Sequence, residues 1–272
     1  SGLILTAAAV PDKNGIARLS FGKNLAPGNA DIHLKVLDTE KKLIMAEKII
    51  PVKIAPEQQA GPGICVIDKS GRAIVDGKPY LPVGLFTSDL KRDDVKRIAA
   101  SPFNCLMSYS VSLKFPDSKK EGLEAVREVL DELAKNNIKV IYSIKDLYDG
   151  YPTIDRRWKL YGAGSADESV RIIVNEFKDH PAVLAWYICD ELGRHWIERL
   201  ENRRYLVNSL DRKHPTWAVY YKFPELPFYT STCDVMGIDP YPITNPGRHN
   251  MELVNIGMNA VENTGNTTVW GV

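Results

Sequence analysis

The spacing of apolar residues along the chain predicts most of its elements. From residue 64 onward, short apolar runs of strand length alternate with segments whose apolar residues recur every three or four positions, as on one face of a helix. The runs predict strands at 80–86, 103–110, 138–144, 182–189, 216–221, 233–239 and 267–272. The spaced segments predict helices at 88–101, 117–137, 166–180, 194–214 and 250–263.

Most of these strands are apolar on both faces, which is typical of a parallel sheet covered by helices. Two architectures fit this alternation, an open doubly wound sheet and a closed (β/α)8 barrel. The doubly wound dinucleotide-binding fold needs a glycine-rich turn after its first strand, and the segment GLFTSDL at 84–90 lacks one. We therefore predict an α/β fold of the TIM-barrel type. The sequence ends within the predicted seventh strand, so we expect the barrel to be completed by residues beyond it or to be irregular.

The first sixty residues have a different pattern, in which apolar and polar residues alternate in short runs between turn signals. Residues 32–38 and 49–54 predict strands. We expect residues 1–60 to form an immunoglobulin-like β-sandwich segment. A stretch rich in Pro, Gly and Gln at 55–63 predicts a linker, and a hairpin at 64–80 opens the barrel domain at 64–272.

Charge and composition exclude several classes of partner and cofactor. Lys and Arg number 35 against 34 Asp and Glu, which does not favour a nucleic acid or an acidic membrane as partner. No apolar run is long enough to span a membrane. The first ten residues lack a basic segment and an initiator Met, so we expect a signal peptide to have been removed and the protein to be secreted or periplasmic. The five histidines are scattered and the four cysteines lack CxxC spacing, so we expect no metal, no cofactor and buried free thiols.

Chemistry in such a barrel lies at the carboxyl ends of the strands. The residues at those ends are mostly carboxylates and aromatic side chains, a combination that suits sugar rings. The predicted substrate-binding set is Tyr109, Asp146, Tyr187, Tyr220, Asp239, Tyr241 and Trp270. A buried position in the barrel is an equal alternative for Trp270. The RRW segment at 156–158 lies in a long loop and either holds an acidic sugar or is solvated.

Two adjacent carboxylates, Asp190 and Glu191, end the fourth strand. Because side chains alternate along a strand, Tyr187, Cys189 and Glu191 are expected to share one side, with Cys189 and Tyr187 beneath Glu191 in the barrel. The alternative is that one of the two acids caps the following helix. We favour function for Glu191, whereas the two interpretations of Asp190 are even.

Four motifs occur in strand order: VDGKPYLPVGLF at 75–86, FNCLMSYS at 103–110, AWYICDEL at 185–192 and DVMGIDPYP at 234–242. In this order the chain resembles the (β/α)8 glycoside hydrolases of the large retaining clan that includes β-galactosidases and cellulases. The resemblance implies that Glu191 is the general acid/base, with a raised pKa beside another carboxylate. It also implies that Asp190 contacts the sugar 2-hydroxyl and that Asp239 and Tyr241 orient the sugar.

The chain departs from the clan's pattern at three positions. Asp190 stands where the clan usually has Asn, and Met107 stands near a position that is often Arg. The clan's nucleophile is a Glu at the end of strand seven, which here reads TTVWGV, and Glu262 falls in the preceding helix. We therefore carry two hypotheses, a glycosidase and a carbohydrate-binding barrel without turnover. A third class, a metal-dependent barrel enzyme using Asp146, Asp190 and Asp239, is less favoured.

Overall fold

The computed structural model describes residues 6–11, 17, 19, 26–54, 61–68, 70–150, 161–245, 247–264 and 268–272. The chain divides into two compact units, Ser1–Gln59 and Ala60–Val272. In the first unit, β1 (Gly28–Asp38) pairs antiparallel with β2 (Leu43–Ile54), and the register shifts between Val36 and Leu37. The predicted strands at 32–38 and 49–54 lie within β1 and β2. The immunoglobulin-like sandwich stays a prediction.

The second unit is built on a sheet of seven parallel strands in the order β14-β11-β10-β9-β8-β7-β6. A doubly wound sheet reverses its strand order at a switch point, whereas a barrel adds each strand beside the previous one. The observed order is sequential throughout, so the prediction of a TIM-type barrel is confirmed. Within the described ranges, β6 and β14 do not pair with each other, and the sheet is a curled part of a barrel. The strands are β6 (Gly84–Thr87), β7 (Cys105–Ser108), β8 (Lys139–Ser143), β9 (Val183–Asp190), β10 (Thr216–Tyr220), β11 (Val235–Ile238) and β14 (Val269–Gly271).

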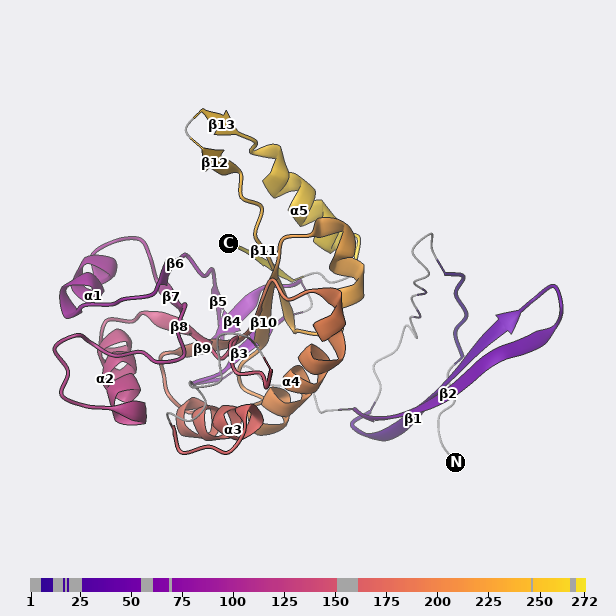
Figure 1. Ribbon diagram of the computed structural model, residues 1–272, viewed down its shortest axis with the longest axis horizontal. Coiled ribbons are helices and arrows are strands. Elements are labelled where there is room, and N and C mark those ends of the chain that lie inside the picture. The colour runs from indigo at the N-terminus through magenta and orange to yellow at the C-terminus, as the bar shows by residue number, and fades with distance from the viewer. Residues whose placement is uncertain are drawn as a thin grey trace. The chain divides into compact units, whose positions relative to one another are not determined.

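Among the described residues, five α-helices follow the strands around the outer side of this sheet (Figure 1). In α2 the predicted apolar face is buried, because Val126, Leu130 and Leu133 recur at helical spacing. Helix α3 begins where the Ser165 hydroxyl accepts a hydrogen bond from the Glu168 N–H at 3.1 Å. The bounds are α1 (Arg92–Ala99), α2 (Gly122–Lys135), α3 (Ala166–Phe177), α4 (Ile197–Leu210) and α5 (Glu252–Glu262), with 3₁₀ helices η2 (Arg194–Trp196) and η3 (Phe223–Tyr229) and a short hairpin of β12 (Ile243–Asn245) and β13 (Arg248–His249).

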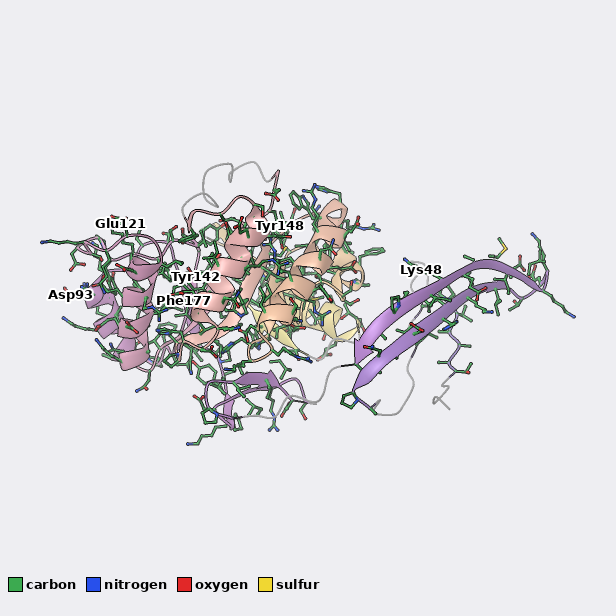
Figure 2. All side chains as sticks on the ribbon, turned by 90° about the horizontal axis from the view of Figure 1, so that it is seen from below. Lys48, Asp93, Glu121, Tyr142, Tyr148 and Phe177 are labelled. Carbon is green, nitrogen blue, oxygen red and sulfur yellow. The ribbon has the colours of Figure 1, made fainter. Side chains whose placement is uncertain are left out.

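The apolar core has two layers, one on each face of the sheet. The outer layer lies between strands and helices, where Tyr142 of β8 and Phe177 of α3 have ring centroids 5.8 Å apart (Figure 2). The inner layer fills the concave face, where Tyr187 packs on Trp217 at 4.8 Å. A Cβ atom at Gly237 would lie 2.8 Å from the Trp217 ring nitrogen, so this glycine leaves the room that the indole occupies.

A small sheet covers the amino end of the barrel. It consists of β3 (Cys65–Ile67), β4 (Ala73–Val75) and β5 (Lys78–Tyr80), with Asp76 and Gly77 both at positive φ in the second turn. The Cys65 N–H donates to the carbonyl of Lys213, just before β10, at 2.8 Å. Because this sheet covers the amino end, the carboxyl end of the parallel strands is the end available for a functional site.

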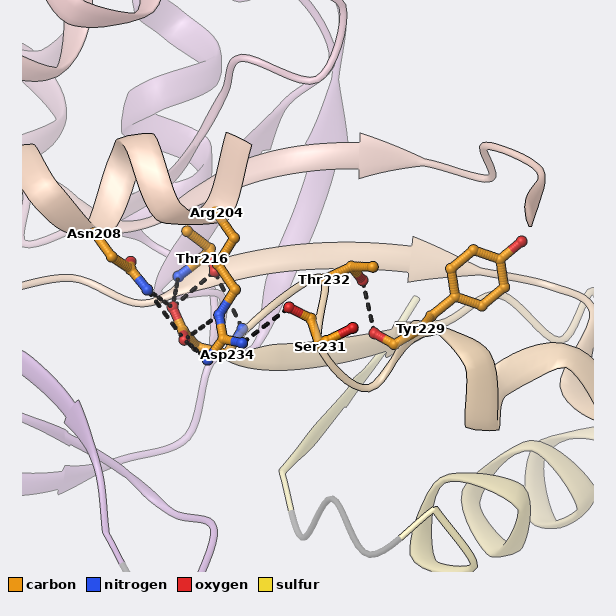
Figure 3. Close-up of polar contacts among 7 residues, drawn as sticks. All are labelled: Arg204, Asn208, Thr216, Tyr229, Ser231, Thr232 and Asp234. Atoms are coloured by element: carbon orange, nitrogen blue, oxygen red, sulfur yellow. Dashed lines mark hydrogen bonds and ion pairs between the residues drawn. The ribbon is translucent and has the colours of Figure 1, made fainter. Parts of the chain in front are cut away.

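A carboxylate in the outer layer ties α4 to the start of β10 and β11. Asp234 accepts bonds from Arg204 of α4 at 2.7 and 2.9 Å, and from the N–H and hydroxyl of Thr216 at 2.9 and 2.7 Å (Figure 3). Asn208 adds longer contacts to both carboxylate oxygens. These bonds fix the register of the strands whose far ends carry the site.

Two further predictions concern the chain as a whole. All four cysteines are buried and free, as expected. None of the described helices is long and apolar enough to cross a membrane.

Candidate active site

Glu191 lies directly after β9, at the carboxyl end of the sheet. Its N–H donates to the carbonyl of Val219 on β10 at 2.9 Å, and the Tyr241 hydroxyl donates to its Oε1 at 3.4 Å. Burial raises the pKa of the Glu191 carboxyl most, followed by the charges of Asp239 and Asp190, while the Tyr241 bond lowers it. The net effect is a raised pKa, so this acid holds its proton to a higher pH than an exposed glutamate.

The two residues joined by that bond both have left-handed backbones. Glu191 has φ 58° and Tyr241 has φ 44°, and only three other described non-glycine residues have positive φ. Such a conformation costs a residue with a Cβ about 1 kcal/mol or more. Strain at two residues that contact each other across the carboxyl end is typical of a functional site.

Alternation along β9 fails near its end, which corrects the predicted grouping of side chains. Tyr187 lies in the inner layer, but Cys189 lies in the outer layer with Trp186. The cause is an irregularity in pairing, since Tyr187 faces Trp217 of β10 while the next pair is Cys189 with Ala218. Cys189 is therefore not beneath Glu191, because the bulge turns it to the helix side of the sheet.

The helix-cap alternative for the two acids is also decided. The residue that precedes η2 is Gly193, and the residue that precedes α4 is Trp196. Neither helix start has a side-chain capping bond. Asp190 and Glu191 are thus placed at the strand end without serving as caps.

A buried lysine holds Asp190. Lys145, at the end of β8, has its Nζ 3.0 Å from Asp146 Oδ1 and 3.3 Å from Asp190 Oδ2, and its side chain is 5% exposed. The same Nζ lies 4.0 Å from the centre of the Tyr109 ring. Burial lowers the pKa of Lys145, but the charges of Asp146 and Asp190 outweigh it and the pKa is raised. One cation therefore serves two carboxylates, and the cluster keeps a net negative charge.

Two tyrosines flank the Asp190 carboxylate. Tyr187 is fully buried, and its hydroxyl makes no hydrogen bond to another described residue. Burial and then the charge of Asp190 raise its pKa, so the hydroxyl stays protonated. Tyr109 is half exposed, and burial together with its hydrogen bond to Asp190 raises its pKa. The Tyr109 hydroxyl thus donates to Asp190, and the Tyr187 hydroxyl lies buried close to the same carboxylate.

Asp239 follows β11 and lies opposite this cluster. Burial raises the pKa of its carboxyl, the hydrogen bond from Tyr241 lowers it, and the charge of Asp190 raises it again. The hydrogen bond to Asp239 is also the largest cause of the raised pKa of Tyr241, whose side chain is half exposed. Tyr241 thus bridges Asp239 and Glu191.

The structure brings Tyr109, Asp146, Tyr187, Asp190, Glu191, Asp239 and Tyr241 to this end through the contacts above. Two other predicted residues make their ring contacts away from the carboxylates, although Tyr220 lines the narrow crevice that Glu191 also lines. Tyr220 is 2% exposed in the outer layer, where its ring stacks on Tyr229 and its hydroxyl contacts Thr232 at 2.6 Å. Trp270 packs against the inner layer, with its ring centroid 6.5 Å from that of Trp217. The RRW segment lies outside the described residues.

Two residues of the site, Lys145 after β8 and Tyr221 after β10, are not among the predicted site residues. Tyr221, which follows Tyr220, is 44% exposed and lines a cavity beside Glu191. Two adjacent aromatic residues at the end of β10 were the only signal in the sequence. Because side chains alternate along a strand, Tyr221 points away from the outer layer that holds Tyr220. Among the described residues, no group of three His, Cys, Asp or Glu side chains could hold a metal ion.

No family model and no curated protein sequence matches the chain. Solved structures do match. A glycosyl hydrolase family 2 member from Bacteroides cellulosilyticus is 13% identical with a TM-score of 0.50, and covers 90% of this chain and 40% of its own. A glycoside hydrolase family 5 mannosidase from Rhizomucor miehei is 12% identical with a TM-score of 0.55, over 77% of this chain and 72% of its own.

A family 2 β-galacturonidase from Eisenbergiella tayi, bound to galacturonate, is 12% identical with a TM-score of 0.53, over 90% of this chain and 50% of its own. The chain therefore spans half or less of the length of the two family 2 structures. At these identities the likeness concerns the fold. The parallel sheet of this chain has the fold of the TIM-barrel domains of glycoside hydrolase families 2 and 5, as a seven-stranded part of such a barrel.

Proposed function

We propose that the barrel unit is a glycoside hydrolase that cleaves an oligo- or polysaccharide, with Glu191 as general acid and base. The observation that carries the proposal is the state of Glu191 at the end of the fourth parallel strand. It is half-buried on a strained backbone, bonded to Tyr241, and its pKa is raised beside Asp239 and Asp190. A carboxyl group with a raised pKa is suited to donate a proton to a leaving glycosidic oxygen.

The reaction conserves the proton of Glu191. Its carboxyl group gives the proton to the bridging oxygen, the bond from that oxygen to the anomeric carbon breaks, and the leaving sugar departs as a neutral alcohol. Water then supplies a hydroxyl to the anomeric carbon, and the proton lost by that water returns to Glu191. A retaining enzyme does this in two displacements, with a second carboxyl group about 5–5.5 Å from the first.

The neighbouring side chains are suited to hold a sugar in this position. Asp190, fixed by Lys145, and Asp239 accept hydrogen bonds from sugar hydroxyls, while the exposed faces of Tyr109 and Tyr241 stack on apolar ring faces. Asp146 is buried and forms an ion pair with Lys145, so it influences a bound sugar through that lysine.

The test of the catalytic assignment is Glu191→Gln, with Glu262→Gln on the exposed end of α5 as the matched control. Glu191→Gln is expected to lower kcat for aryl glycosides with poor leaving groups by about a hundredfold or more, and to affect dinitrophenyl glycosides less because they need no proton. Circular dichroism and thermal unfolding should match the unaltered protein. Turnover of the poor substrates at the original rate in Glu191→Gln would remove Glu191 from the mechanism. The anomer first seen by NMR distinguishes retention from inversion.

A second candidate is a barrel that binds carbohydrate without cleaving it. It is favoured by one observation, the exposed aromatic side chains at the carboxyl ends of four different strands: Phe86, Tyr109, Tyr221 and Tyr241. Such rings serve binding alone as well as catalysis. Calorimetric binding of an oligosaccharide that stays intact after prolonged incubation would favour this candidate over the hydrolase.

A further inference from the structure

Among the described residues, carboxyl groups outnumber cations in the candidate active site. The carboxyl groups are those of Asp146, Asp190, Glu191 and Asp239. The ammonium group of Lys145 pairs with two of them, Asp146 at 3.0 Å and Asp190 at 3.3 Å. The other two, Glu191 and Asp239, lie outside its contacts.

Asp239 is a half-buried carboxylate without a cation. Within the described part of the chain, no Lys, Arg or His side chain forms an ion pair with Asp239 or Glu191. The charges that shift the pKa of these two carboxyl groups are all negative, from Asp190 at both and from Asp239 at Glu191. Lys222 is exposed, and its Nζ lies 5.6 Å from the centre of the Tyr221 ring. Because a partly buried charge is costly without an opposite one, Asp239 favours a cation that a ligand brings.

A ligand can reach Asp239. Its side chain lines a cavity of about 410 Å³, within the range of about 300–1,000 Å³ that small-molecule sites occupy. Tyr221 and Tyr241 line the same cavity with exposed rings, and Tyr241 is hydrogen-bonded to Asp239. Aromatic faces stack on sugar rings and also attract cations. These surroundings suit a ring that carries a positive charge.

A second sign of a ligand lies beside the carboxylates. The Tyr187 side chain is fully buried, and its hydroxyl has no hydrogen-bond partner among the described residues. The charge of Asp190 acts on this hydroxyl, which therefore lies close to that carboxylate. Buried polar atoms are nearly always hydrogen-bonded in folded proteins. An ammonium group, with three N–H donors, can bond to the hydroxyl and to carboxylates together.

The chemistry of the site favours an ammonium group over a metal ion. A divalent cation binds through several converging oxygen ligands, and no group of three described His, Cys, Asp or Glu side chains could hold one. An ammonium group needs only one or two carboxylates. Glu191 acts at the anomeric carbon, C1, and the adjacent ring carbon that bears a substituent is C2. A cation beside the neighbours of Glu191 is therefore an amine on C2.

We propose that the sugar bound at this site is a 2-amino sugar with a free amine, whose ammonium group is held by Asp239 together with Asp190. The inference rests on the proposed function and names its substrate class. Because Asp190 already pairs with Lys145, Asp239 supplies the main charge that the amine neutralises. The N-acetylated form of the same sugar has no charge and lacks this ion pair.

The experiment compares sugars that differ only at C2. Calorimetry measures the Kd of phenyl thioglycosides, whose sulfur link resists hydrolysis, in three pairs: glucosamine and glucose, galactosamine and galactose, mannosamine and mannose. At a slightly acid pH, where the amine is protonated, the amino member of at least one pair is expected to bind about tenfold or more tightly than its neutral partner. Asp239→Asn should lower that ratio about tenfold, whereas Glu262→Gln, on the exposed end of α5, should leave it within about twofold. Added salt should weaken binding of the amino member more than that of the neutral one.

The proposal is overturned if no amino member binds, or if the neutral member binds as tightly in every pair. An unchanged ratio in Asp239→Asn overturns it as well. If Asp239→Asn does not fold, the salt dependence of the unaltered protein decides, because equal dependence in both members of the pair overturns the proposal. Cleavage assays test the hydrolase separately. Cleavage of neutral glycosides alone supports the hydrolase and overturns the amino-sugar site, whereas an amine preference without any cleavage supports the site and removes the hydrolase.

Discussion

Replacing Lys145 with Met is expected to destabilise the barrel more than any surface charge removal would. The Lys145 side chain is 5% exposed, and its Nζ lies 3.0 Å from Asp146 and 3.3 Å from Asp190. Methionine has a similar volume without the charge. The variant therefore keeps the packing but leaves two carboxylates facing each other without a cation.

The magnitude follows from the burial of the partners. Their side chains are 10% and 20% exposed for Asp146 and Asp190, so solvent screens them little. Each attraction at such a distance is about 5 kcal/mol at an effective dielectric constant of about 20, and most of it offsets desolvation. Breaking a buried pair costs about 3–5 kcal/mol, because the remaining charges are uncompensated. For a unit of this size that lowers Tm by on the order of 10 °C.

The pH dependence has a definite sign. The pKa of Lys145 is raised above its ordinary 10.5, so its contribution to stability is fully present below that pH and is lost only as pH rises through the raised pKa. In Lys145→Met the destabilisation comes from carboxylate charge. It should therefore be the same at pH 7 and at pH 9, because Lys145 keeps its charge in the unaltered protein throughout that range.

The assay is urea unfolding followed by circular dichroism at both pH values. The double variant Lys145→Met/Asp190→Asn is the informative comparison, because it removes one of the two stranded charges and should recover about 1–2 kcal/mol. A loss below about 1 kcal/mol in Lys145→Met, or a double variant no more stable than the single one, would refute the reasoning.

Three other variants test separate parts of the structure. Asp239→Asn removes a like charge that raises the pKa of Glu191, so the alkaline limb of the kcat/KM profile, where the acid loses its proton, should move to lower pH; an unmoved limb contradicts this. Asp234→Ala removes the bonds that join α4 to β10 and should lower the free energy of unfolding by about 2–4 kcal/mol in denaturant titrations, with the Asn variant in between. Gly237→Ala forces a methyl group to within 2.8 Å of Trp217 and should lower the free energy of unfolding by about 1–3 kcal/mol. An unchanged Tm in calorimetry would contradict this expectation.

The strand ends were predictable because the strands are short apolar runs with clear limits. Strands of a covered parallel sheet are apolar on both faces, so β7 to β11 stand out from the polar turns around them. The carboxyl end of each run then gives the candidate positions. The 3₁₀ helix η3 and the β12–β13 hairpin have no such period, and neither was predicted although η3 lines the cavity that Tyr221 and Tyr241 also line.

Side-chain direction at the end of β9 was not predictable, because simple alternation assumes regular pairing. The bulge opposite Trp217 and Ala218 moves Cys189 to the outer layer, and the positive φ of Glu191 then redirects the chain. Neither feature has a glycine or another sequence signal in β9. The same holds at the end of β10. The strand end was predicted correctly, but the exposed aromatic residue there is Tyr221 and not Tyr220.

The two adjacent acids also interact less than their sequence suggests. Asp190 is next to Glu191 in the chain, yet the charge of Asp239, which is distant in sequence, raises the pKa of Glu191 more. The Nζ of Lys145 lies 3.3 Å from Asp190, so a cation accompanies that carboxylate. Asp in place of the Asn expected from the resemblance is thus accompanied by a cation from a neighbouring strand, 45 residues away. A pair of that kind keeps a hydrogen-bond acceptor beside the acid without placing a second free anion there, and only the three-dimensional structure brings its members together.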